Sequence, residues 1–173
     1  MLGDQNASIA NIADMPGLSH NDAMTQEKAV RWVPVDGLPE LPFESFDLSN
    51  KASDNRLTVR AYFRDLSKVG LPQFEPPVAG VILVFDNVEA FKAYEEFSDP
   101  LNASDLEVPL LADDVPYGGP WGFIQMLGSS WLEGLAERNA GWSADSAAHW
   151  ILKTGDMVLH VATEPSVAPA IEG

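Results

Sequence analysis

The chain has 173 residues, enough for one domain with a hydrophobic core, and it contains no cysteine. Disulfides, thiolate catalysis and cysteine-ligated zinc or iron–sulfur centres are therefore excluded. Its 26 acidic residues outnumber its 10 basic residues and give a formal net charge of -16. Because nucleic-acid binders need a basic surface, this charge argues against direct nucleic-acid binding and favours either a solvated surface or a basic partner protein.

The N-terminus lacks the features of a targeting segment. Residues 1–11 show no basic region followed by an apolar stretch, and the longest apolar run, residues 78–85, is about a third of the length that a membrane span needs. We therefore expect a cytoplasmic protein without membrane association. Residues 1–28 are small, polar and aperiodic, which predicts a flexible tail, and Met24 is an alternative start of the native chain.

Prolines and alternation define the first half of the domain. The prolines between residues 30 and 46 exclude a helix there, and the apolar side chains around them predict an irregular arm pinned on the surface. Residues 57–64 alternate apolar and polar, which indicates a half-buried strand. The continuous apolar run at 80–85 predicts a strand covered on both faces or central in a sheet.

The middle of the chain is less regular. Residues 87–97 have the composition of a helix, but their alternation fits a strand equally, so both remain open. Residues 98–128 have no clear period and predict a long loop, with Trp121 buried at a turn. A capping-box pattern at residues 130–133 (SWLE) predicts a short helix from Ser130 to Arg138.

Two alternating apolar runs on either side of Gly155 and Asp156 predict a β-hairpin with a primed turn. If Thr154 faces Met157, the register is fixed along both strands. One apolar face then consists of Trp150, Leu152, Met157, Leu159 and Val161.

The same register makes His149 and His160 diagonal neighbours on the opposite face, at about 7–8 Å between backbones. Two imidazoles with a carboxylate suit a metal site or a general base, whereas histidines satisfied by hydrogen bonds or water are the structural alternative. The sequence has no nucleophile, phosphate-loop, zinc or calcium motif. We therefore predict no catalytic residue, metal or cofactor. We keep as the alternative function a small enzyme, or a ligand- or metal-binding protein, that uses His149 and His160 with a carboxylate.

Together these segments predict an α+β fold, with an antiparallel sheet and one short helix packed on a face. The expected organisation is a tail at 1–28, a single domain at 29–168 and a C-terminal tail at 169–173, since Pro165 and Pro169 should end the last strand.

Negative charge is concentrated between residues 86 and 114, where Lys92 is the only base. This concentration leads to the main functional hypothesis, a binding protein without enzymatic activity whose acidic surface meets a basic partner protein. The candidate partner surface consists of Asp99, Asp105, Glu107, Asp113 and Asp114.

Three short motifs occur in a fixed order along the chain. They are Val88-Glu89-Ala90-Phe91 followed by Glu95-Glu96, then Ser130-Trp131-Leu132, then a strand starting at His149 whose partner returns through residues 159–164 and Val167. Over about residues 56–168 this order resembles a group of small, uncharacterised bacterial α+β proteins, some associated with toxin-immunity genes. The resemblance implies that residues 87–96 continue the preceding strand, and that the protein is an immunity-type inhibitor. His149 matches the histidine of that group, whereas His160 does not.

Overall fold

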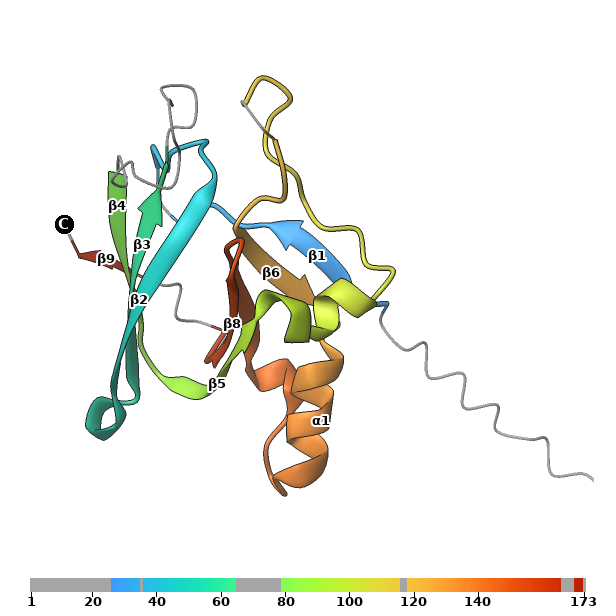
Figure 1. The fold of residues 1–173 in the computed structure, drawn as a ribbon. Helices are drawn as coiled ribbons and strands as arrows, with labels where there is room; N and C mark the ends of the chain where they lie inside the picture. The colour runs from blue at the N-terminus through green and yellow to red at the C-terminus, as the bar shows by residue number, and fades with distance from the viewer. Residues whose placement is uncertain (1–25, 35, 65–78, 116–117, 166–169, 173) are drawn as a thin grey trace, which may run out of the picture.

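The computed structural model describes residues 26–34, 36–64, 79–115, 118–165 and 170–172. Within these residues, nine β-strands form two antiparallel sheets, and one α-helix packs beside them (Figure 1). The predicted α+β class is therefore confirmed. None of the described helices has the length and apolar character needed to cross a bilayer.

The first sheet has five strands. In spatial order they are β1 (Lys28–Arg31), β6 (Phe123–Leu127), β7 (Ala148–Lys153), β8 (Met157–Thr163) and β5 (Val88–Glu95). The second sheet has four strands, in the order β2 (Phe43–Lys51), β3 (Arg56–Phe63), β4 (Ala79–Phe85) and β9 (Ala170–Glu172). Helix α1 (Ser130–Arg138) follows β6. A 3-10 turn at Ala144–Ser146 then leads from the helix to β7.

The predicted hairpin is β7 and β8, and its register is confirmed. Trp150 lies opposite Val161, and Leu152 lies opposite Leu159. The primed turn is wrong, because Gly155 does not have the positive φ that such a turn requires. A side chain shapes the turn instead: the Thr154 hydroxyl accepts the backbone N–H groups of Asp156 at 3.2 Å and of Met157 at 3.0 Å.

The core lies between the two sheets. Strand β3 confirms its predicted pattern, since Leu57, Val59, Ala61 and Phe63 are all fully buried. The five-stranded sheet contributes buried side chains from β6, β7 and β8: Phe123, Trp150, Leu152, Leu159 and Val161. Met157, expected on the same face, is 39% exposed because it lies at the end of β8, beyond the core.

The arm expected between residues 30 and 46 is largely wrong, because its ends are the strands β1 and β2. Aromatic packing draws the intervening segment into the core. The Trp32 ring lies 4.6 Å from the Trp150 ring, and the Trp32 carbonyl accepts the indole N–H of Trp121 at 2.8 Å. Trp121 is 2% exposed, as predicted. Burial of these rings therefore organises the proline-rich segment.

Residues 88–95 are the strand β5, which settles the helix-or-strand question in favour of a strand. The segment does follow β4, but it lies in the other sheet. The change of sheet occurs at Asp86 and Asn87, and Asn87 has a positive φ of 52°. Asparagine tolerates this left-handed conformation better than most residues, which suits it to the corner.

Three other expectations are corrected. The loop expected at 98–128 contains β6, which lies between β1 and β7 in the five-stranded sheet. Residues 170–172, expected in a C-terminal tail, pair with β4, so that Ile171 lies opposite Leu83. Helix α1 has the predicted bounds, but its N-cap is Ser129, whose hydroxyl accepts the N–H of Leu132 at 3.2 Å. Leu132 is the buried residue of this helix.

We expect Gly122→Ala to destabilise the protein by about 1–3 kcal/mol, as overpacked cores typically do. A Cβ at residue 122 would lie 2.7 Å from atoms of Phe43 and 3.0 Å from the Lys153 carbonyl oxygen. Chemical denaturation measures the change. The control is Gly80→Ala, where the nearest atom, the Ala61 carbonyl oxygen, would lie at an ordinary 3.6 Å. Equal stability of the two variants would contradict the packing described here.

Candidate functional site

The two histidines lie where the hairpin register predicts. His160 is opposite Ile151 and His149 is opposite Ala162, so the imidazoles are diagonal neighbours on the outer face of the five-stranded sheet. His149 Nε2 lies 2.9 Å from His160 Nδ1, and both residues are buried, at 3% exposure. The imidazoles therefore hydrogen-bond directly to each other.

A hydroxyl and a carboxylate extend this pair at its two ends. Ser129 Oγ lies 2.8 Å from His149 Nδ1, and His160 Nε2 lies 3.2 Å from Asp99 Oδ1. We call Ser129, His149, His160 and Asp99 the polar chain. One proton arrangement satisfies it: the serine hydroxyl donates to His149, His149 to His160, and His160 to the carboxylate. Ser129 also accepts a backbone N–H as the helix cap, so the chain connects α1 to residue 99.

Burial keeps both imidazoles neutral. Together with the nearby charges of His160 and Lys92, burial, the largest cause, lowers the pKa of His149 to about 2. Burial also lowers the pKa of His160, although the hydrogen bond to Asp99 opposes this. The pKa of Asp99 is raised by burial but lowered more by its hydrogen bonds from His160 and the Leu101 N–H, with a net lowering. The chain at neutral pH is thus a carboxylate, two neutral rings and a hydroxyl.

Among the described residues, the two histidines are not arranged to share a metal ion. Every ring nitrogen of His149 and His160 already has a protein partner, and the rings face each other instead of converging on a shared point. No group of three or more His, Cys, Asp or Glu side chains is placed to hold a metal ion in the described part of the chain. The polar chain instead ties α1, β7, β8 and the segment after β5 together.

A pocket of about 270 Å³ lies beside the polar chain, and both histidines line it. Lys92 and Trp131 also line the pocket, with the Lys92 ammonium 4.6 Å from the centre of the Trp131 ring. This is a cation–π distance. Lys92 is the direct cross-strand neighbour of His160, so its positive charge adds to the cost of protonating the histidines.

Asp99 does not belong to an exposed partner surface, contrary to prediction, because it is 3% exposed. Its Oδ1 caps the 3-10 turn Pro100–Ala103 through the Leu101 N–H while also contacting His160. Its Oδ2 is buried without a hydrogen-bond partner among the described residues. The carboxylate therefore fixes the start of the segment that carries the other acidic candidates.

The other four candidates, Asp105, Glu107, Asp113 and Asp114, are exposed. None of them forms an ion pair with a residue that the structure describes. Residues 101–108 lie over the outer face of the five-stranded sheet, where Leu101, Leu106 and Val108 pack against a buried cluster that includes Ala29 and Ile124. Apolar contacts thus hold the segment while its carboxylates remain in solvent.

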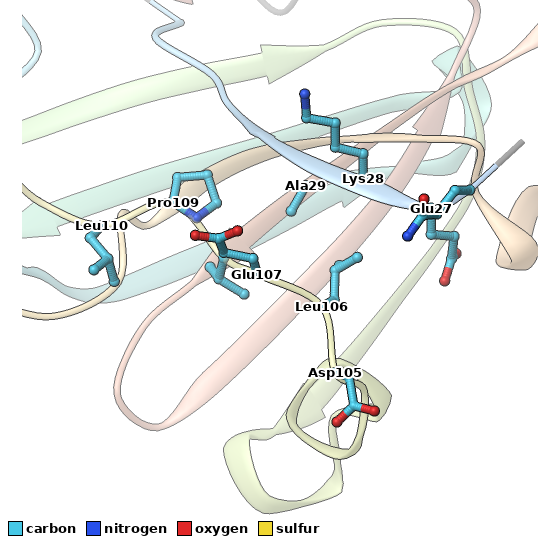
Figure 2. Close-up of a pocket in the computed structure, with 10 residues that line it drawn as sticks. Glu27, Lys28, Ala29, Asp105, Leu106, Glu107, Pro109 and Leu110 are labelled. Atoms are coloured by element: carbon cyan, nitrogen blue, oxygen red, sulfur yellow. The ribbon is translucent and has the colours of Figure 1, made fainter.

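A larger pocket, of about 740 Å³, opens between this segment and β1 (Figure 2). We call it the β1 groove; residues 26–29 line one side, and residues 105–110 line the other. In Figure 2 the Lys28 side chain points away from residues 105–110, whereas the Glu107 carboxylate lies on the side of its segment that faces β1. Glu27 also lines the smaller pocket, and its carboxylate accepts the Ser130 N–H at 2.7 Å.

Sequence reasoning missed Ser129 and Glu27. The two consecutive serines, Ser129 and Ser130, are a usable signal, because serine is a preferred N-cap and either serine can cap the helix. Glu27 contacts a residue 103 positions away, and no local pattern predicts this.

Comparisons with protein-family models, with curated proteins and with solved structures found no match to this chain.

We expect Ser129→Ala to lower the free energy of unfolding by about 2 kcal/mol or more, because it removes the helix cap and leaves a buried ring nitrogen of His149 unpaired. The control Ser130→Ala, at the exposed position that the sequence pattern favours as the cap, should change stability by less than about 0.5 kcal/mol. Urea denaturation measures both. A larger loss for Ser130→Ala would refute the assigned cap.

Acid should destabilise the protein through the histidines. Unfolded, His149 binds a proton near its ordinary pKa of 6.5, whereas the folded ring stays neutral until about pH 2. The contribution of a buried neutral histidine to stability is therefore fully present above pH 6.5 and is lost as the pH falls. Well below pH 6.5 the loss is about 1.4 kcal/mol per pH unit for each such histidine. Denaturation between pH 7.5 and 4.5 should show a shallower pH dependence for His149→Gln than for the wild type, whatever the stability of the variant at pH 7.5. Parallel curves would count against a buried neutral His149.

Proposed function

We propose that the protein is a binding protein without enzymatic activity whose acidic surface meets a basic partner protein, in the manner of an immunity-type inhibitor. The observation that carries this proposal is a set of four exposed carboxylates, none of which forms an ion pair with a residue in the described part of the chain: Asp105, Glu107, Asp113 and Asp114. Apolar side chains on the same segment, including Leu106, Leu111 and Val115, pack against the buried clusters and fix these charges in place. A prearranged charged surface of this kind speeds association with a partner of opposite charge.

The net charge of -16 supports the same proposal. Repulsion among like charges opposes the folded state, and a basic partner would relieve it. Ion pairs already involve several acidic side chains elsewhere, as in the contacts of Arg56 with Asp86 and of Arg64 with Glu44. The carboxylates of residues 105–114 remain available for charges supplied from outside.

The alternative, a small enzyme or ligand-binding protein using His149 and His160, draws support from the 270 Å³ pocket that both rings line. It is the weaker proposal because both imidazoles are buried and burial opposes protonation of His149. A general base must accept a proton near the working pH.

We expect charge reversal of the acidic segment to abolish partner binding. The full chain is immobilised, proteins captured from the source lysate are identified, and the captured partner is purified and measured by surface plasmon resonance. The test variant replaces four residues by lysine: Asp105, Glu107, Asp113 and Asp114. It should reduce the association rate at least tenfold at low salt, an effect that salt screens.

The control variant makes the same change in net charge at exposed acidic residues outside the segment: Glu89, Glu95, Glu137 and Asp145. A much smaller loss of association rate is expected for this control. If both variants bind like the wild type, or if the captured partner is acidic, the proposed function is wrong.

A further inference from the structure

Strand β1 is an edge of the five-stranded sheet, since it pairs with β6 alone. The Trp32 N–H donates to the Phe123 carbonyl at 3.0 Å, which marks this pair as a hydrogen-bonded one. In an antiparallel ladder the bonded pairs alternate, so Lys28 and Val30 also bond inward to β6. The backbone groups of Ala29 and Arg31 therefore point outward, to the free edge.

These outward groups have no backbone partner among the residues that the structure describes. Ala29 is 8% exposed and lines the β1 groove, so the free edge faces this groove. Free strand edges are usually blocked by charge, proline or a covering element. Here the covering segment, residues 105–110, lies on the far side of a space of about 740 Å³.

Both walls of the β1 groove are held in place. On the β1 side, the Arg31 guanidinium lies 3.9 Å from the Trp121 ring centre and pairs with Glu40, and Glu27 binds the N-terminus of α1. On the other side, Asp99 fixes the start of the segment, and the Trp121 N–H donates to the Pro109 carbonyl at 2.7 Å. A groove with fixed walls loses little conformational entropy when it is occupied.

The charge of the groove indicates its occupant. Three carboxylates line it, from Glu27, Asp105 and Glu107, against the single ammonium of Lys28, which points away from residues 105–110. Apolar contact is available from Leu106, Val108 and Leu110 on the same wall. An extended segment that alternates basic and apolar residues would place its charges and its apolar side chains on different faces.

We propose that the β1 groove binds an extended, lysine- or arginine-containing segment of the partner protein, which adds to the free edge of β1 as a strand. This proposal rests on the proposed function, and specifies how the basic partner is held. The segment is about four to six residues long, matching the four residues 26–29 that line one side of the groove and the six of the facing wall. Backbone hydrogen bonds to Ala29 and Arg31 provide affinity, and the carboxylates select for basic side chains.

The probe for the test is a fluorescein-labelled hexapeptide of alternating lysine and valine, titrated with the full-length protein in fluorescence anisotropy at low salt. We expect it to bind, and the same peptide with glutamate in place of lysine not to bind. Two further peptides carry N-methyl groups on all lysines or on all valines. Because alternate N–H groups point to opposite edges of a strand, only one of these two should weaken binding, by about tenfold or more.

On the protein side, Ala29→Pro removes the outward N–H at the edge while leaving the inward bonds of Lys28 and Val30 intact. This variant should bind the lysine–valine peptide about tenfold more weakly than the wild type does. The double variant Asp105→Asn, Glu107→Gln should also weaken peptide binding, whereas Asp113→Asn, Asp114→Asn outside the groove should have a much smaller effect. Circular dichroism reports whether the Ala29→Pro variant folds. If it does not fold, the N-methylated peptides still test the backbone hydrogen bonds at the edge, because they are measured on the wild-type protein.

Equal binding of the two N-methylated peptides, or no binding of the lysine–valine peptide, would overturn strand addition. A second outcome would also overturn strand addition: the Asp105, Glu107 double variant loses binding, but neither N-methylated peptide binds more weakly. In that case the proposed function of the acidic surface would remain supported. Failure of the charge-reversed segment to affect the purified partner would instead refute the proposed function itself.

Discussion

The alternation of side chains along β7 and β8 is the constraint on which the rest of the structure depends. One face sends Trp150 and Leu159 into the core between the sheets, and the other sends His149 and His160 to the outer face. Because the side-chain period of a strand is two, a register slip of one residue would exchange these sets. Imidazoles would then enter the apolar core and Trp150 would face α1. One register therefore fixes both the packing and the polar chain.

Strong local periodicity explains what the sequence could predict. The hairpin register, the diagonal histidines and β3 all follow from alternation over short distances, and the structure confirms them. Strand β6 was missed because a five-residue apolar stretch among glycines and prolines carries little period. The contact of Asp99 with His160 joins residues 61 positions apart, and no local signal predicts it. Its carboxylate was therefore grouped with the exposed acids around it.

The polar chain and the acidic segment are parts of one arrangement. Asp99 is a buried carboxylate, and it anchors the beginning of a segment whose later carboxylates stay in solvent. Anchoring a charge away from water is costly unless hydrogen bonds and nearby positive charge compensate it. His160, the Leu101 N–H and the Lys153 charge supply that compensation. The wall of the β1 groove is thus positioned from within the protein.

The corner at Asn87 has a mechanical consequence. It passes the chain from one sheet to the other within two residues, and the Asn87 side chain donates to Glu164 while Val88 N–H donates to the Asn55 carbonyl. Such a short, cross-linked connection gives the two layers no hinge at this corner. The two layers should therefore exchange their deepest amide hydrogens together, as one cooperative unit.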